Sequence, residues 1–202
     1  MTNSNITVIV PTYNRVALLQ ETLQSVLDQT YPVLEIIVVD NGGTDSTEQM
    51  ISQLHDARIR YERIEPSGGP AKPRNYGAAM ARGSVISFLD SDDLWKPTKI
   101  EDELTFWKKT DADIITCLAR EYIHGREGPL VRYPIKEGYL SYRDVALDNP
   151  VVGANFSINK NLFLRIGGFD EDIRLAGAED KDFLVRASVV ASFGVVRKVK
   201  DA

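Results

Sequence analysis

The sequence predicts an α/β fold in which helices cover both faces of a mainly parallel sheet. Short apolar runs rich in β-branched residues alternate with segments of helical periodicity through the first ninety residues. Apolar runs of this length are typical of strands that are buried on both sides. Strands that alternate with helices form right-handed β-α-β units, which place consecutive strands parallel in one sheet. A chain of 202 residues fits one such domain.

Four strands and three helices are predicted before residue 90. The predicted strands are the runs 6–10, 36–39, 59–61 and 85–89. The first helix, 16–27, has apolar residues at spacings of three and four, with Asn14 as its N-cap. The second helix starts from a capping-box pattern at 45–48. The third covers 74–81 and ends at Gly83, which is expected to act as its C-cap.

After residue 90 the alternation becomes less regular, which predicts a smaller subregion beside the main sheet. The remaining predicted elements are a helix that starts at Pro97, a strand over 113–118, a hairpin over 120–133, a short helix over 141–147, a strand over 155–159, a helix over 162–166 ended by two glycines, and a final helix over 180–190. No linker or internal repeat separates these elements from the first half.

Charge and cysteine content narrow the classes of partner. The chain has 24 Lys and Arg against 29 Asp and Glu, a net charge of -5, so no overall basic field attracts nucleic acid. The single cysteine, Cys117, cannot form an intrachain disulfide, which fits a reducing compartment. No apolar run reaches the roughly 18 residues that a membrane span needs, and no signal peptide is evident. We therefore expect a cytoplasmic protein, and its plain C-terminal sequence leaves open a continuation in a longer, membrane-associated protein.

Polar residues follow each of the first four predicted strands, at the point where the strand ends. These segments are 11–14, 40–43, 67–69 and 90–93. The carboxyl ends of parallel strands lie along one edge of a sheet, and open α/β sheets bind their ligands outside that edge. Strand order alone therefore predicts a ligand site built from these four segments.

The densest cluster on this edge holds three carboxylates, those of Asp90, Asp92 and Asp93. Holding them together costs charge repulsion, which a hard divalent cation removes. Mg²⁺ and Mn²⁺ accept one or two carboxylates and complete their coordination with water and phosphate oxygens. The alternative is a solvated turn in which Asp93 caps a helix. At this edge of the sheet we favour the metal site.

Other polar residues on the edge have both a functional and a purely structural interpretation. Asp40 could accept hydrogen bonds from a nucleotide base, or it could simply form the turn. Gly69 and Arg74 suit a diphosphate, because backbone approach and a guanidinium fork both bind phosphate, although Arg74 could also be a surface arginine. Glu179 and Asp180 open the last helix, where the helix dipole stabilises acids in any case. Dinucleotide-binding, Walker A and nucleophile-elbow motifs are absent from the sequence.

Five segments in order give the sequence a specific resemblance. They are Val8-Ile9-Val10-Pro11-Thr12-Tyr13-Asn14-Arg15, Val38-Val39-Asp40-Asn41-Gly42-Gly43-Thr44-Asp45, Gly68-Gly69-Pro70-Ala71-Lys72-Pro73-Arg74-Asn75, Phe88-Leu89-Asp90-Ser91-Asp92-Asp93 and Gly177-Ala178-Glu179-Asp180. Together they resemble glycosyltransferase family 2, the inverting nucleotide-sugar transferases of GT-A fold. The resemblance covers residues 6 to 186.

The resemblance implies a role for each matching residue. The residues implied to bind the donor are Pro11, Thr12, Tyr13, Asp40, Gly69, Arg74 and Asp90. Asp90 and Asp92 match the family's D-x-D pair, which implies Mn²⁺ or Mg²⁺ as cofactor. Asp180 matches the general base, with Glu179 supporting it near the acceptor. The sequence departs from the family pattern at Asn41, Gly43 and Pro73.

The implied function is transfer of a sugar from a nucleotide donor, with a UDP-sugar expected, to a hydroxyl of a carbohydrate or lipid-linked acceptor. This would serve cell-surface polysaccharide or glycoconjugate synthesis at the inner face of a membrane. Residues 1–95 would form the donor-binding half and residues 96–202 the acceptor-binding half of one domain. Two alternatives remain, a sugar-nucleotide nucleotidyltransferase and a noncatalytic sugar-nucleotide-binding module.

Overall fold

The computed structural model describes residues 5–123, 126–131, 138–141, 143–145, 151 and 153–196. The strands are β1 (Ile6–Thr12), β2 (Glu35–Asp40), β3 (Ile59–Arg63), β4 (Val85–Phe88), β5 (Ile114–Cys117), β6 (Ala119–Ile123), β7 (Arg126–Val131), β8 (Gly138–Leu140), β9 (Phe156–Asn159) and β10 (Phe193–Val196). The helices are α1 (Val16–Leu27), α2 (Thr47–Leu54), α3 (Ala71–Met80), α4 (Lys99–Trp107), α5 (Lys160–Ile166) and α6 (Glu179–Ser188), with a 3₁₀ turn, η2, at Ile173–Leu175.

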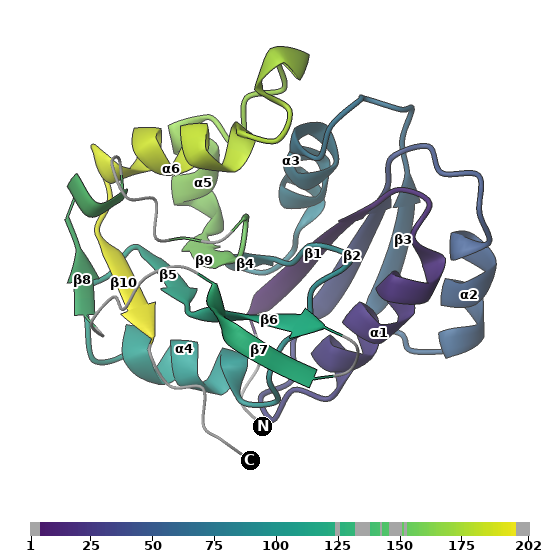
Figure 1. The fold of residues 1–202 in the computed structure, drawn as a ribbon, viewed down its shortest axis with the longest axis horizontal. Helices are drawn as coiled ribbons and strands as arrows, with labels where there is room; N and C mark the ends of the chain where they lie inside the picture. Colours follow the sequence, from purple (N-terminus) through teal and green to yellow (C-terminus); the bar gives the residue numbers. More distant parts are fainter. Residues whose placement is uncertain are drawn as a thin grey trace.

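One large sheet organises the described part of the chain, with strands in the order β3-β2-β1-β4-β9-β5-β10-β8 (Figure 1). Strands β1 to β4 run parallel, as predicted. Strand β9 lies antiparallel between β4 and β5, which leaves β5 and its parallel neighbour β10 in the same direction as the first four strands. Strand β8 is antiparallel to β10, and β6 and β7 form the predicted hairpin. The prediction of a mainly parallel sheet is therefore confirmed.

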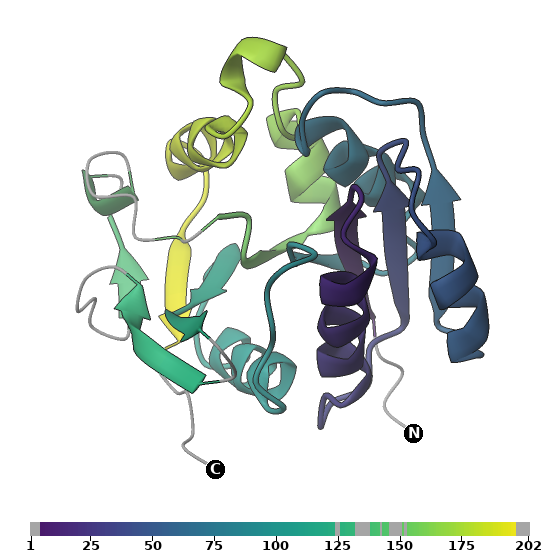
Figure 2. The same ribbon diagram turned by 45° about the vertical axis from the view of Figure 1, so that its right-hand side comes forward.

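Each face of the sheet carries its own hydrophobic core, which explains the continuous apolar runs of the strands. Val8 and Val10 of β1 pack with α1, α2 and α4 on one face. Ile9, between them, packs with α3, α5 and α6 on the other. Figures 1 and 2 show these helices on the two sides of the sheet. A strand buried on both sides has no polar face, so its sequence does not alternate.

A cluster of phenylalanines fixes the second half of the chain to the first. Phe88 of β4 and Phe156 of β9 contact Phe163 of α5, Phe169 of the following turn and Phe183 of α6. The centroids of these rings lie 5.0 to 6.2 Å apart, the range in which aromatic pairs attract. Helix α6 is thereby packed beside the end of β4, close to the edge on which the ligand site is predicted.

The predicted starts of α1 and α2 are correct to within one residue, but their predicted caps are wrong. Asn14 does not cap α1. Its φ is 50°, and its Oδ1 accepts hydrogen bonds from the backbone of Thr44 and Asp45. Asp45 in turn accepts the N–H of Val16 at the start of α1 and that of Thr47 at the start of α2. In place of a capping box at 45–48, hydrogen bonds of the Asn14 and Asp45 side chains join the loop before α1 to the loop before α2.

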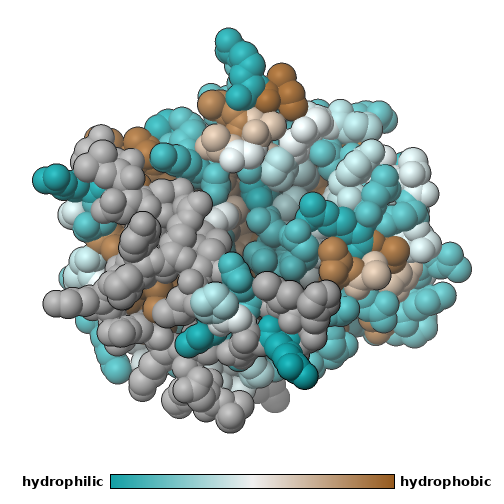
Figure 3. All heavy atoms as spheres, viewed as in Figure 1, coloured by the Kyte–Doolittle hydropathy of each residue, from teal (hydrophilic) through white to brown (hydrophobic). Residues whose placement is uncertain are grey.

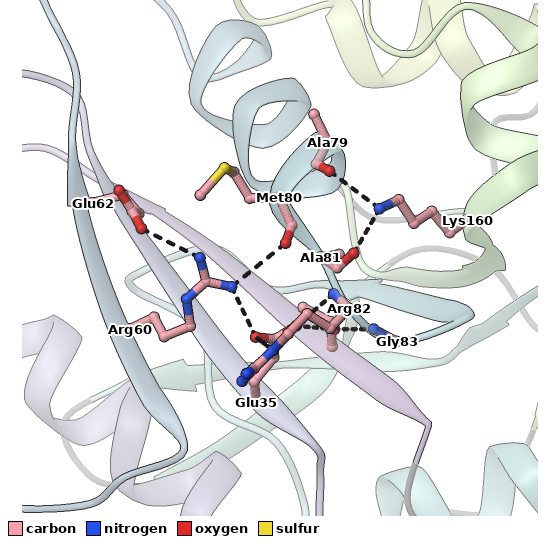
Figure 4. Close-up of polar contacts among 10 residues, drawn as sticks. Glu35, Arg60, Glu62, Ala79, Met80, Ala81, Arg82, Gly83 and Lys160 are labelled. Atoms are coloured by element: carbon pink, nitrogen blue, oxygen red, sulfur yellow. Dashed lines mark hydrogen bonds and ion pairs between the residues drawn. The ribbon is translucent and has the colours of Figure 1, made fainter.

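Helix α3 begins three residues before its predicted start, and Gly83 is not its C-cap. The helix ends at Met80, and Gly83 lies against β1 instead. A β-carbon at Gly83 would lie 2.5 Å from the carbonyl oxygen of Asn5, so only glycine fits. Two cations cover the free carbonyls at this helix end (Figure 4). Lys160 donates to the carbonyls of Ala79 and Ala81, and Arg60 donates to the carbonyl of Met80.

Figure 4 also shows a buried carboxylate, that of Glu35, at the opposite end of β2 from the polar rim. Its Oε1 accepts the hydroxyl of Thr7 and the backbone N–H of Arg82, and its Oε2 accepts the guanidinium groups of Arg60 and Arg82. Burial opposes ionisation of Glu35, but these hydrogen bonds outweigh it and lower the pKa of the carboxyl. The network ties β1, β2, β3 and the end of α3 together.

The described part of the second half contains two strands that the sequence did not predict. Strands β8 and β10 were not predicted, because β10 is short and contains Gly194. A β-carbon there would lie 2.4 Å from the ring of Phe106, so glycine lets α4 approach the strand closely. Of the helix predicted at 141–147, residues 142, 146 and 147 lie outside the described residues, and 143–145 are helical. The helices predicted at 97, 162–166 and 180–190 correspond to α4, α5 and α6. Within the described residues, no helix is long and apolar enough to cross a membrane.

Candidate active site

A cleft of about 510 Å³ lies at the edge of the sheet where β1 to β4 end. Loops that follow all four strands contribute to it, as strand order predicts. The predicted site residues that line the cleft are Pro11, Thr12, Tyr13, Gly69, Arg74, Asp90 and Asp92. Tyr13 is 55% exposed, so its ring is available to a ligand, and Thr12 Oγ1 is buried without a hydrogen-bond partner among the described residues. The cleft thus combines aromatic, hydroxyl, guanidinium and carboxylate groups.

Asp40 lies below the cleft rather than in its lining. The carboxylate is buried, and it accepts the backbone N–H of Gly43 at 2.7 Å and the hydroxyl of Tyr61 at 2.8 Å. Burial and the hydrogen bond to Asp40 raise the pKa of Tyr61, which keeps its hydroxyl protonated. Asp40 therefore shapes the turn after β2, including Gly43, where a β-carbon would lie 2.8 Å from Asp40 Oδ1.

Asn41 connects two walls of the cleft. Its Oδ1 accepts the N–H and the hydroxyl of Ser67, and its Nδ2 donates to the carbonyl of Gly69 at 3.2 Å. An aspartate at this position could not donate to Gly69. The departure from the family pattern at Asn41 therefore has a local reason, since the amide holds the loop after β3 against the end of β2.

The loop that contains Gly68 also contacts η2. Gly68 has a φ of +78°, and a β-carbon there would lie 2.7 Å from Cδ1 of Ile173. Ile173 is 57% exposed. In Figure 3 the described surface on this side is largely hydrophilic, and its apolar atoms form small separate groups, one of them over η2 at the top. The apolar tip of η2 therefore stands beside the loop that lines the cleft.

Arg74 links the cleft to the start of α6. Its side chain is 4% exposed, and its Nη2 donates to Asp90 at 2.5 Å while its Nη1 donates to Glu179 at 2.7 Å. Burial alone would lower the pKa of Arg74, but the two carboxylates outweigh burial and raise the pKa above its ordinary value. Pro73 does not disturb this placement, because it lies in the first turn of α3, where its missing N–H has no helical partner. Arg74 therefore joins two acids that lie 89 residues apart in sequence, the difference between positions 90 and 179.

Glu179 and Asp180 differ in their surroundings although they are adjacent. Glu179 is buried, and besides its ion pair with Arg74 it accepts the N–H of Gly177 at 2.7 Å. Asp180 is half-buried, and among the described residues its carboxylate accepts a hydrogen bond only from the N–H of Lys181. Partial burial raises the pKa of the Asp180 carboxyl, and the negative charge of Glu179 adds to this effect. Glu179 is thus fixed by protein contacts, whereas Asp180 has the greater freedom to meet a ligand.

The three acids of the turn after β4, Asp90, Asp92 and Asp93, have different surroundings. Asp90 pairs with Arg74, and Asp92 pairs with Arg15 at 2.6 Å across the mouth of the cleft. Partial desolvation, together with the charges of Asp90 and Asp92, raises the pKa of Asp93 to about 6. Among the described residues, no group of three or more acidic, histidine or cysteine side chains converges as a metal cage. Two carboxylates beside a cleft suit Mg²⁺ or Mn²⁺ that is also held by substrate phosphates.

Four residues of this region were given no role of their own in the sequence analysis, namely Arg15, Ser67, Asn75 and Arg186. Each acts through contacts with segments distant in the chain, such as the pair of Arg15 with Asp92 and the bonds of Asn75 to the turn after α5. Residue type alone carries no signal for contacts of this kind. The adjacency of Asn75 to Arg74 is the one local feature that could have drawn attention to it.

The open, mainly parallel sheet with this rim of polar residues and an acid pair after β4 defines a GT-A fold. Comparison with known proteins agrees. The family described as glycosyl transferase family 2 matches residues 7–164, and the chain belongs to this family.

Relatives and solved structures extend the likeness. The chain is 34% identical over 151 residues to Bacillus subtilis TuaG, which is named for a glycosyltransferase of teichuronic acid biosynthesis, and this covers 73% of the chain and 59% of TuaG. It is 38% identical over 101 residues to Escherichia coli WfaP, named as a UDP-Glc:alpha-D-GlcNAc-diphosphoundecaprenol beta-1,3-glucosyltransferase, covering 50% of the chain and 40% of WfaP. A crystal structure of S. aureus TarS in complex with UDP superposes with a TM-score of 0.80 at 26% identity, covering 98% of the chain and 59% of that TarS chain. The chain thus spans about 59% of the length of TuaG.

Proposed function

We propose that the chain catalyses inverting transfer of a sugar from a UDP-sugar to a hydroxyl of a carbohydrate or lipid-linked acceptor, with Mn²⁺ or Mg²⁺ as cofactor. One observation carries this proposal. Arg74 bridges Asp90, on the rim that would hold the donor, and Glu179, next to the residue that would deprotonate the acceptor. Donor and acceptor groups are therefore held in one rigid arrangement, which is what a direct displacement requires.

On the donor side, the cleft offers groups that match the parts of a nucleoside diphosphate. Tyr13 presents an exposed ring for a base, and Thr12 Oγ1 has no hydrogen-bond partner within the described part of the chain. The backbone of Gly69 lines the same cleft without a side chain in the way of a diphosphate. Asp40 supports this wall from below. UDP is the favoured nucleotide because TarS binds UDP and WfaP is named for a UDP-glucose donor.

Asp90 and Asp92 would hold the metal ion together with the diphosphate oxygens of the donor. When bound, the ion would offset the negative charge that develops on the departing diphosphate. Asp92 would have to leave its exposed ion pair with Arg15, which costs little because exposed pairs contribute at most about 1 kcal/mol. Arg15 would then be free to approach the same phosphates.

On the acceptor side, Asp180 would act as the general base. The acceptor oxygen attacks the anomeric carbon, the bond from that carbon to the diphosphate breaks, and its electron pair leaves with UDP. The proton of the acceptor hydroxyl passes to Asp180. A single displacement of this kind inverts the anomeric configuration. Glu179 holds the start of α6 through Arg74 and Gly177.

The experiment that tests this proposal measures product release from candidate donors with Mn²⁺ present. UDP-GlcNAc, UDP-glucose, GDP-mannose and a dTDP-sugar are each incubated with the protein, and release of nucleoside diphosphate is followed. We expect UDP release from at least one UDP-sugar. Pyrophosphate release from UTP and a sugar phosphate would identify a nucleotidyltransferase instead, and nucleotide binding without any release would identify a noncatalytic module.

Two variants locate the chemistry within the fold. Asp180→Asn should leave UDP affinity unchanged and reduce turnover by about 10²-fold or more, the range typical of general-base catalysis. Asp111→Asn is the matched control, because Asp111 is an exposed aspartate at the other end of the sheet, beside the start of β5. Equal turnover in both variants would overturn the assignment of Asp180.

A further inference from the structure

We propose that Asn75 is a positioning residue that sets the place of Asp180 by fastening the turn between α5 and η2 to α3. The inference rests on the proposed function, in which Asp180 is the general base. We call the contacts among Asn75, residues 166–171 and Arg186 the α3 latch. Helix α3 also carries Arg74, so one helix holds both the donor rim and the approach to the catalytic helix.

Asn75 uses all of its side-chain polar atoms on this one segment. Its Oδ1 accepts the backbone N–H of Phe169 at 2.9 Å, and its Nδ2 donates to the carbonyl of Phe169 at 2.8 Å. The same Nδ2 donates to Oε1 of Glu171 at 2.8 Å. A paired donor and acceptor on one backbone residue fix both the distance and the orientation of the turn. These three bonds span 94 to 96 residues of sequence.

The turn itself is shaped to receive Asn75. Gly167 and Gly168 both have positive φ, 98° and 66°, so the chain reverses directly after α5. A β-carbon at Gly168 would lie 2.7 Å from Oδ1 of Asn75, and therefore glycine is required for the side chain to reach its partners. Phe169 is anchored below in the aromatic cluster, with the guanidinium of Arg74 5.4 Å from its ring centroid.

Helix α6 is fastened to the other side of the same turn. Arg186 donates from Nη2 to the carbonyl of Gly168 at 2.8 Å and from Nη1 to the carbonyl of Ile166 at 3.1 Å. Asp182, one turn earlier on α6, holds this guanidinium in place through its Nε. The turn is thus clamped between α3 and α6, and the position of α6 relative to α3 depends on it.

The consequence concerns the reaction rather than donor binding. The cleft that would bind the donor is lined by the loops after β1 to β4, and Asn75 is outside that lining. If the latch opens, Asp180 loses its alignment while the donor site stays intact. Small misplacements of a catalytic group reduce the rate by up to about 10²-fold. A merely structural role would instead lower stability and donor affinity together.

The test compares Asn75→Ala with Asn161→Ala in the full chain. Asn161 is an exposed asparagine on α5 and undergoes the same chemical change, and its side chain makes no hydrogen bond to any of the described residues. With UDP-GlcNAc as donor, we expect kcat of Asn75→Ala to fall about 10- to 10²-fold, with KM changed by less than about threefold. Arg186→Gln, which weakens the latch from α6, should show the same division between kcat and KM. It keeps the proposal testable if Asn75→Ala does not fold.

Hydrogen exchange provides a readout that needs no substrate. In Asn75→Ala the amide of Phe169 loses its acceptor, so peptides covering 167–178 and the first turn of α6 should exchange faster, while β1 and β2 stay unchanged. Unchanged exchange in 167–178, or a kcat equal to that of Asn161→Ala, would overturn the latch. If the wild type fails to turn over any UDP-sugar, the proposed function fails, and exchange alone then decides whether the latch exists.

Discussion

Glu35→Gln is the change that tests most directly what holds the sheet together. Glu35 is completely buried, and its two oxygens divide their partners. Oε1 accepts two neutral donors, the Thr7 hydroxyl and the Arg82 backbone N–H, at 2.8 and 2.6 Å. Oε2 accepts two cationic donors, Arg82 Nε at 2.8 Å and Arg60 Nη1 at 3.0 Å. A glutamine has the same shape, so its amide oxygen can keep the neutral pair.

The expected loss of stability comes from the hydrogen bonds to Oε2 of Glu35. The amide nitrogen would face two guanidinium groups, and two charge-assisted hydrogen bonds, each contributing about 1.5 to 3 kcal/mol, would be lost. The Arg60 and Arg82 side chains are 27% and 62% exposed, so water can take up part of their hydrogen bonding. We therefore expect the free energy of unfolding at neutral pH to fall by about 3 kcal/mol, at the low end of values for breaking buried pairs.

This loss should depend on pH, in a direction that the lowered pKa of Glu35 determines. A carboxyl whose folded pKa lies below its ordinary value of 4.5 contributes stability above that value and loses it as the pH falls through the folded pKa. Glutamine does not titrate. The difference in stability between wild type and Glu35→Gln should therefore be constant above about pH 5 and shrink toward zero in more acidic solution.

The assay is urea unfolding followed by circular dichroism, from about pH 7 down to about pH 4. Glu62→Gln is the matched control, because Glu62 meets Arg60 only at 3.4 Å, is partly exposed, and should cost less than about 0.5 kcal/mol. A loss in Glu35→Gln no greater than in this control, or a difference that stays constant down to the acid limit, would refute the reasoning.

Three further predictions address the site and the core. Asp92→Asn should abolish most of the Mn²⁺ dependence of UDP affinity in calorimetry, because it removes one of two available carboxylates; an unchanged dependence would contradict the metal proposal. The base acts in its deprotonated form, and the pKa of Asp180 is raised, so turnover should fall on acidification at a pH above the ordinary aspartate pKa. A pH-rate profile whose acidic limb lies at or below the ordinary aspartate pKa would contradict this. Gly194→Ala should destabilise the fold by about 1 to 3 kcal/mol in thermal unfolding, because its β-carbon would meet Phe106 at 2.4 Å; an unchanged melting temperature would contradict this.

The first half of the fold could be predicted because its signals are local. The apolar run 36–39 predicts a strand, and the spacing of apolar residues in 16–27 predicts a helix, each from a few neighbouring residues. Strand β10 could not be predicted in the same way. It has four residues, one of them glycine, and its strand conformation depends on parallel pairing with β5, about eighty residues earlier in the chain.

The same division holds within the candidate site. Strand order placed the polar ends of β1 to β4 on one rim, and the cleft is found there. The predicted cap at Asn14 was wrong because its Oδ1 accepts hydrogen bonds from two backbone N–H groups of a neighbouring loop instead of from the start of α1. Short polar side chains have several backbone partners within reach, and the tertiary structure decides among them.

The contacts of Arg74 could not be predicted from its position on the rim. Its place after the glycine-rich loop suggested a residue that binds phosphate, yet its two terminal nitrogens each donate to a carboxylate of the protein. The pairing with Glu179 spans 105 residues and depends on tertiary packing, in which Phe183 of α6 contacts Phe163 of α5 and Phe169 of the turn after it. If Glu179 lost Arg74, its buried carboxylate would be left without its ion-pair partner, so the structure resists any rearrangement that separates the donor rim from α6. The property that makes Arg74 unpredictable from its neighbours in sequence is therefore the same property that lets it hold the two halves of the site in register.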